Sequence, residues 1–149
     1  MTTEIQKIIK NYTYNGFGFP VELCNVEVIL INGEWCPKID VRSVADSVIQ
    51  SLVSQASRLT GNQIKFIRTY FSMSLRGFSR IVNESHMAVK KWEAFLNEPT
   101  NMDKNIEIML RLHIYDHVVV KTAKNKDEKI KFYNMFLVLT KIFSHPLTA

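Results

Sequence analysis

The chain is poor in cysteine, and this scarcity excludes one class of fold. Only two of its 149 residues are cysteines, Cys24 and Cys36. Small secreted domains that are stapled by disulfides carry four or more cysteines at regular spacings. Two isolated thiols also fall short of the four convergent ligands of a structural zinc site, so we expect neither a metal nor a cofactor. Both cysteines are expected to be small buried hydrophobic residues.

The sequence also lacks the patterns of a membrane-spanning or exported protein. No run of about 18 apolar residues occurs, so no spanning helix and no membrane partner are expected. The first residues, MTTEIQKIIKNY, have no apolar stretch followed by a small-residue cleavage site. Because 46% of the residues are hydrophobic, the chain can still bury a core. These features predict a cytoplasmic protein.

Catalytic signatures are missing as well. The sequence contains no nucleophile elbow, Walker A motif, GxGxxG or HExxH. Gly16 and Gly18 are too few and too poorly placed to cradle a phosphate. His113 and His117 share one face of an expected helix, but no third ligand accompanies them, so surface histidines are expected rather than a metal site. We therefore predict that the protein is not an enzyme.

What the sequence does have is unevenly distributed positive charge. The chain has a net charge of +5, yet residues 1–58 hold five basic and six acidic side chains. Residues 59–92 hold six basic residues against the single acid Glu84. These six are Lys65, Arg68, Arg76, Arg80, Lys90 and Lys91. Clustered charge of one sign in a helical stretch is typical of a phosphate-binding face, although a solvated lysine-rich surface would look the same.

The N-terminal part favours strands. Residues 12–41 are rich in β-branched residues, and Asn32-Gly33 is the strongest short signal for a hairpin. A two-residue loop at this position predicts three cross-strand pairs: Ile31 with Glu34, Leu30 with Trp35, and Ile29 with Cys36. Cys24 would not face Cys36 in this register, so no disulfide is implied.

Helical patterns occupy the rest of the chain. Expected helices cover residues 40–55, 60–71, 74–82 and 85–97, another begins at 103, and a last covers 127–143. Asp40 or Ser43 can cap the first helix, and Thr60 with Gln63 forms a capping box. In the third helix we expect Phe78, Ile81 and Val82 to face inward.

The expected fold class is therefore α+β, mainly α. A small β-hairpin module with a connecting helix would cover residues 1–57, and a helical domain would cover residues 58–120. A charged connector and a C-terminal helix would complete the chain at residues 121–149. The segment 132–143 is apolar on most sides, and we expect it to form a two-fold interface rather than to pack on the protein's own core.

The polar break between residues 82 and 86 predicts a tight turn between two helices. Asn83 tolerates the left-handed conformation, and Ser85 can cap the helix that follows. At 100° per residue, Ala88, Val89 and Trp92 fall on one arc of that helix. The opposite arc holds His86, Met87, Lys90 and Lys91. A short helix with a buried inner face and a basic outer face suits the major groove of DNA.

This arrangement resembles the helix-turn-helix of the Cro/phage-repressor (XRE-like) family, which has the lambda-repressor-like fold. The matching residues run Ser74…Phe78-Ser79…Ile81-Val82-Asn83…Ser85…Val89…Trp92-Glu93. The resemblance implies double-stranded DNA as partner and base contacts from His86, Met87 and Lys91. It also implies contacts to the DNA backbone from Arg76, Ser85, Lys90 and Asn97.

The layout upstream is similar to that of MqsA-type antitoxins, in which a small β-rich module and a connecting helix precede the helix-turn-helix. The two CxxC zinc pairs of that family are absent here. The resemblance implies a dimeric transcriptional repressor in a toxin-antitoxin system, which regulates its own operon and binds a small toxin protein. The alternative is a protein-interaction module, either toxin-neutralising or for another partner, with a degenerate helix-turn-helix.

Overall fold

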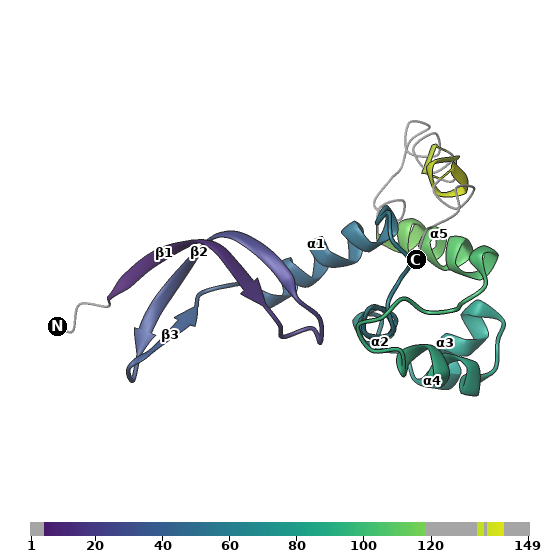
Figure 1. Cartoon of the computed structure of the whole chain (residues 1–149), viewed down its shortest axis with the longest axis horizontal. Coiled ribbons are helices and arrows are strands. Elements are labelled where there is room, and N and C mark those ends of the chain that lie inside the picture. The colour runs from purple at the N-terminus through teal and green to yellow at the C-terminus, as the bar shows by residue number, and fades with distance from the viewer. Residues whose placement is uncertain (1–4, 119–133, 136, 142–149) are drawn as a thin grey trace. The chain divides into compact units, whose positions relative to one another are not determined.

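The structure is a computed structural model, and it describes residues 5–118, 134–135 and 137–141. Its fold is α+β, with a three-stranded antiparallel sheet near the N-terminus followed by helices, as Figure 1 shows. The chain divides into two compact units, residues 1–48 and 49–149. The sheet belongs to the first unit, and most of the helices belong to the second.

The first unit is built on the sheet. Strands β1 (Gln6–Tyr14), β2 (Val21–Ile31) and β3 (Glu34–Pro37) pair in the order β1-β2-β3. Asn32 and Gly33 make the β2–β3 turn with positive φ angles of 51° and 82°, as the Asn-Gly signal requires. The three predicted pairs are confirmed: Ile31 with Glu34, Leu30 with Trp35, and Ile29 with Cys36.

Strand β1 and one cysteine differ from the expectation. The β region was expected to begin at residue 12, whereas β1 already begins at Gln6. Cys24 lies opposite Asn11 and is exposed, so its expected burial was wrong; Cys36 is half-buried, and both thiols are free. Cys24 is exposed although it lies in the central strand. The position of a residue in the central strand does not bury its side chain, because only the side chains on a covered face of a sheet are buried.

Helix α1 (Val41–Val53) begins after a side-chain cap. Of the two candidate residues, Asp40 is the cap: its Oδ1 accepts hydrogen bonds from the backbone N–H of Arg42 (3.1 Å) and of Ser43 (3.3 Å). The hydroxyl of Ser43 also donates to Asp40 Oδ2 at 3.0 Å. The hydrogen bonds from Ser43 hold the pKa of Asp40 below its ordinary value. The boundary between the units falls within this helix, after Val48.

The second unit is helical. It contains α2 (Gly61–Tyr70), α3 (Leu75–Val82), α4 (His86–Glu93) and α5 (Lys104–Val118), and the described residues of the 134–141 segment are also helical. Its core contains Leu59, Ile64, Ile67, Phe78, Val89, Leu110 and Ile114, each at most 2% exposed. The expected caps Thr60 of α2 and Ser85 of α4 are confirmed, and Ser74 caps α3.

Two helical details correct the sequence prediction. Helix α4 ends at Glu93 and not at residue 97, and Leu96 takes a positive φ of 56° in the loop that follows. Ile81 was expected to face inward but is 37% exposed. It lines an apolar groove of about 350 Å³ with Ile106 and Met109 of α5, because α3 and α5 do not close over it.

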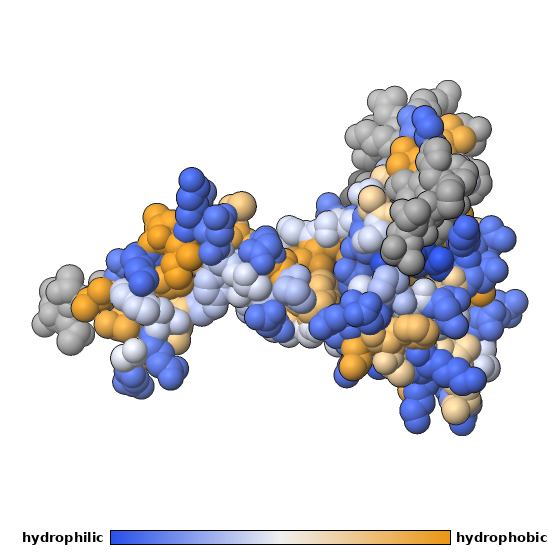
Figure 2. Space-filling model, viewed as in Figure 1, coloured by the Kyte–Doolittle hydropathy of each residue, from blue (hydrophilic) through white to orange (hydrophobic). Residues whose placement is uncertain are grey.

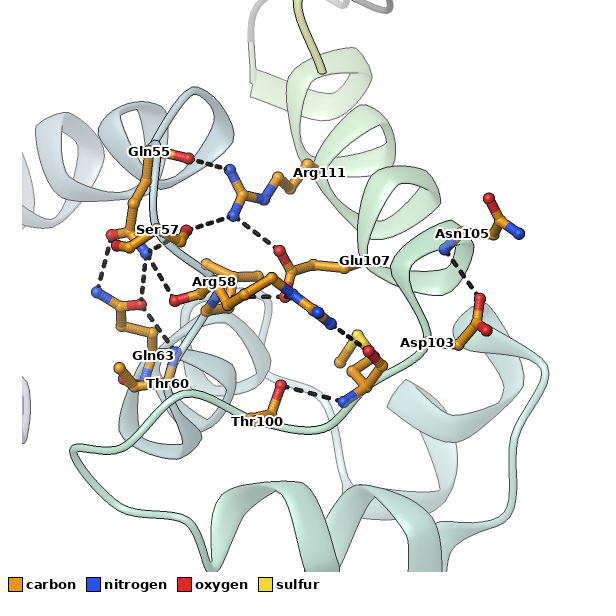
Figure 3. Close-up of polar contacts among 12 residues, drawn as sticks. Gln55, Ser57, Arg58, Thr60, Gln63, Thr100, Asp103, Asn105, Glu107 and Arg111 are labelled. Atoms are coloured by element: carbon orange, nitrogen blue, oxygen red, sulfur yellow. Dashed lines mark hydrogen bonds and ion pairs between the residues drawn. The ribbon is translucent and has the colours of Figure 1, made fainter. Parts of the chain in front are cut away.

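A buried charged network ties the loop before α2 to α5 (Figure 3). Glu107 and Arg111 are both fully buried, and Arg111 Nη2 donates to Glu107 Oε2 at 2.8 Å. The other carboxylate oxygen accepts from Arg58 Nε at 3.0 Å and from the Leu59 N–H at 3.2 Å. Burial lowers the pKa of Arg111 from its ordinary value, and the adjacent Glu107 carboxylate opposes this effect.

The arginines extend this network to the backbone. Arg111 also donates to the carbonyls of Gln55 and Ser57, and Arg58 donates to that of Met102. The connection between α1 and α2 is thereby fixed to α5 by side-chain bonds, so the start of α2 has a defined place in the second unit.

The described helices can be compared with the length and hydropathy that a membrane-spanning helix needs. Across residues 5–118 and the two short described stretches after them, no helix combines the length and apolarity needed to cross a membrane. The expected two-fold interface at 132–143 and the charged connector lie largely outside the described residues. Within the described part of that segment, Leu139 is buried, whereas Leu137 and Val138 are each 46% exposed.

Candidate nucleic-acid interface

The turn between α3 and α4 is set by local backbone chemistry. Asn83 takes the left-handed conformation (φ 54°, ψ 46°), which reverses the chain at the end of α3. The N–H of Glu84 then donates to the carbonyl of Ser79 at 3.0 Å. Ser85 Oγ accepts from the N–H of Ala88 at 3.1 Å and begins α4. The tight turn between α3 and α4 thus follows from residues 83–85, as the sequence predicted.

Helix α4 has one buried face and one exposed face. Val89 is fully buried and Trp92 is 6% exposed, so these two side chains anchor the helix to the second unit. His86, Met87, Lys90 and Lys91 are all exposed, and Met87 reaches 51%. The predicted base-reading residues therefore lie together on one solvent-facing side of a short helix. Figure 2 shows hydrophilic residues over α3 and α4 on the visible face.

An ion pair fixes the C-terminal end of α4. Arg68 of α2 makes a two-pronged contact with Glu93, through Nε to Oε2 at 3.2 Å and Nη2 to Oε1 at 2.8 Å. Arg68 Nη1 also donates to the carbonyl of Met73 at 3.1 Å. Arg68 was counted in the basic cluster of residues 59–92, but it is bonded within the protein. The 25-residue separation between Arg68 and Glu93 gave no local signal for this pair.

Close backbone approach fixes α4 against the start of α2. A Cβ atom added at Gly61 would lie 2.5 Å from the carbonyl oxygen of Trp92 and 2.7 Å from that of Glu93. Both neighbours are backbone atoms, so only glycine fits here without displacing one helix. In the sequence, a glycine directly after the capping residue Thr60 indicates close approach, and we did not predict the contact from it.

The remaining predicted contact residues lie on other elements. Arg76 is exposed on α3, two residues after the capping residue Ser74. Ser85 accepts the capping bond, which leaves its own O–H as a donor. Asn97 lies in the loop after α4, where its Oδ1 accepts from Asn62 Nδ2 at 2.9 Å. Asn97 is therefore associated with the start of α2 and is not part of the α4 surface.

The histidine pair of α5 makes an aromatic cluster. The rings of His113 and His117 lie 4.0 Å apart, and Phe71 meets both edge-on at 6.4 and 6.1 Å. His117 Nδ1 lies 2.8 Å from the carbonyl oxygen of His113. Among the described residues, no group of three or more His, Cys, Asp or Glu side chains is placed to hold a metal ion.

Comparisons with known proteins add no assignment. No protein-family model matches the chain, and neither the curated proteins nor the solved structures contain a match to it.

Proposed function

We propose that this protein is a sequence-specific DNA-binding repressor that inserts α4 into the major groove. The observation that carries the proposal is the exposed set His86, Met87, Lys90 and Lys91 on a helix whose opposite face is buried. An α-helix with its side chains is about 10–12 Å in diameter, which matches the width of the major groove. The resemblance to XRE/Cro-type repressors supports the same assignment.

The exposed side chains have suitable chemistry for this task. Lys91 can donate to O6 and N7 of guanine, His86 can donate to or accept from a base edge, and Met87 can contact a thymine methyl group. Arg76, Ser85 and Lys90 offer donors to phosphate oxygens. Within the described residues, Arg68 is the only one of the six basic residues of the segment 59–92 that pairs with an acidic side chain. Arg76 and Lys90 are thus exposed and have no acidic partner among these residues, which supports their assignment to phosphates.

Two substitutions should separate base reading from phosphate binding. We expect Lys91→Ala to cost about 1–3 kcal/mol on the preferred sequence and to relax base preference, because it removes a base contact. Arg76→Ala should weaken binding to all sequences alike and reduce the salt dependence, because it removes a phosphate contact.

Fluorescence anisotropy can measure both effects. The probes are a duplex selected from a random-sequence library by the wild-type protein and a scrambled duplex of equal composition, each at two salt concentrations. Lys65→Ala, which removes an exposed lysine of α2, serves as the matched control for lost charge. If both variants lose the same factor on both duplexes, the division of roles is wrong. If no duplex is enriched at all, the proposed function itself fails.

The repressor role extends this proposal beyond binding. Helix-turn-helix repressors read two half-sites about one DNA turn apart, so the proposal includes a homodimer. The resemblance to MqsA-type antitoxins adds regulation of its own operon and a small toxin partner. A reporter driven by the gene's own upstream region should be repressed by wild-type protein and released by Lys91→Ala.

A further inference from the structure

The first unit has a small core for its size. Its described buried hydrophobic residues are Phe19, Val26, Val28 and Val48. Units of about 50 residues are marginally stable, and disulfides, metals or association often supplement their cores. Cys24 and Cys36 are free, and the described residues provide no group of three or more metal-ligating side chains. Association with another chain would supply additional burial.

The two edges of the sheet differ in how they are protected. β3 is four residues long and ends at Pro37, so it offers little to a further strand. β1 is nine residues long, contains no proline, and pairs only with β2 among the described strands. A long open edge of this kind is a template for pairing with another strand.

The backbone of β1 directs hydrogen-bonding groups to its open side. The carbonyl of Ile5 accepts from the N–H of Leu30 at 3.0 Å. The later residues of β1 pair with β2 in the same register, beginning with Gln6 opposite Ile29. Residues that bond to the neighbouring strand alternate with residues that turn away from it. The peptide N–H and C=O of Ile8 and Lys10 therefore point away from β2, toward the open edge.

Of the two lysines of β1, Lys10 is exposed, whereas Lys7 does not protect this edge as edge lysines usually do. The Lys7 amine lies 4.1 Å from the ring centre of Trp35 on β3, so it is held over the sheet. Ile8 is 71% exposed, the highest value among the large hydrophobic residues described. Figure 2 shows hydrophobic residues gathered over the sheet on its visible face.

We propose that β1 pairs antiparallel with β1 of a second copy of this chain, across a two-fold axis at Ile8. This register places Lys10 opposite Gln6 of the second copy and Lys7 opposite Ile9, so no like charges face each other. An axis at Lys10 would instead place two lysines directly opposite. The pairing joins two three-stranded sheets into one and covers both copies of Ile8.

The inference shares with the proposed function only the expectation of a dimer, and it stands without DNA binding. It also places the interface in the sheet rather than in the 132–143 segment that the sequence pattern favoured. A second copy fits this edge because the register at Ile8 brings the two exposed isoleucines together and places neither lysine opposite another lysine.

The test uses the full chain in sedimentation equilibrium without DNA. Wild-type protein should sediment as a dimer, and Ile8→Lys should raise the dimer dissociation constant by roughly tenfold or more, because it places two charges opposite each other. Ile8→Pro should do the same, because it removes an N–H that β2 does not use. Ile31→Lys, which changes a 51% exposed residue of the central strand, should leave the dimer unchanged. Far-UV circular dichroism checks that each variant keeps its sheet.

A cross-linking experiment fixes the register. In a chain with Cys24→Ser and Cys36→Ser, Ile8→Cys should form a disulfide-linked dimer under mild oxidation. Facing residues of a hydrogen-bonded pair lie about 5.5 Å apart, within disulfide range. Thr13→Cys should not, since the two copies of residue 13 lie far from the axis.

Several results would overturn the inference: a wild-type monomer at all concentrations, a dimer insensitive to Ile8→Lys, equal loss with Ile31→Lys, or equal cross-linking at residues 8 and 13. If the natural partner of β1 is a strand of another protein, the wild-type chain should be a monomer at all concentrations. Loss of DNA binding alone changes none of these readouts.

Discussion

Glu107→Ala should destabilise the second unit by about 3–5 kcal/mol, the usual cost of breaking a buried ion pair from one side. The Glu107 carboxylate is fully buried and accepts bonds from Arg58, Leu59 and Arg111. Its removal leaves Arg111 charged and buried without a counter-ion, which is the main source of the loss. Urea unfolding followed by Trp92 fluorescence, in a Trp35→Phe background, measures the change in this unit.

An exposed pair with the same spacing provides the control. Arg42 and Asp46 also lie four residues apart on a helix, but their side chains are 79% and 45% exposed. Asp46 belongs to the first unit, so its effect is followed by Trp35 fluorescence in a Trp92→Phe background. Asp46→Ala should cost less than about 0.5 kcal/mol, because surface pairs contribute little. Similar losses for Glu107→Ala and Asp46→Ala would show that the buried network does not carry the stability assigned to it.

Gly61→Ala should destabilise the second unit much more than Gly77→Ala. At Gly61 the new methyl group would clash with backbone atoms of α4, so we expect a loss of about 1–3 kcal/mol. At Gly77, within α3, the nearest atom to the new Cβ is the Ser74 hydroxyl oxygen at 3.3 Å. There we expect no loss or a gain of up to about 1 kcal/mol, because alanine favours the helix.

The same unfolding experiment measures both glycine variants. Gly61→Ala should also weaken binding to the selected duplex more than Gly77→Ala, because it displaces the helix that carries Lys91. Equal destabilisation by the two changes would mean that the approach of α2 to α4 can relax at little cost.

Local signals in the sequence predicted the turn between α3 and α4 and the buried face of α4. Asn83, Ser85 and the spacing of Val89 and Trp92 determine the turn and the buried face through their own backbone and nearest neighbours. The Asn32-Gly33 turn likewise set the β2–β3 register. These features could be predicted because each depends on residues only a few positions apart.

Features that depend on distant residues could not be predicted in the same way. Glu107 and Arg111 look like an ordinary surface pair in the sequence, and their third partner, Arg58, lies 49 residues from Glu107. Strand β1 was missed over residues 6–11 because IIK interrupts the alternation of polar and apolar residues. Ile81 was assigned inward from periodicity alone, which does not reveal the gap beside α5.

Raising the ionic strength should lower the affinity for DNA without lowering the selectivity for the preferred sequence. The side chains of Arg68 and Glu93 are only 19% and 12% exposed, so added salt screens their attraction weakly. Added salt should therefore weaken the contacts of Arg76 and Lys90 with DNA phosphates, while α4 keeps its orientation. We expect the ratio of the affinity for the cognate duplex to that for the scrambled duplex to stay constant or increase as both affinities fall. A salt titration of both duplexes measures this ratio. A ratio that falls with added salt would contradict the prediction. The mostly buried Arg68–Glu93 ion pair should therefore preserve sequence selectivity at salt concentrations that already weaken DNA affinity.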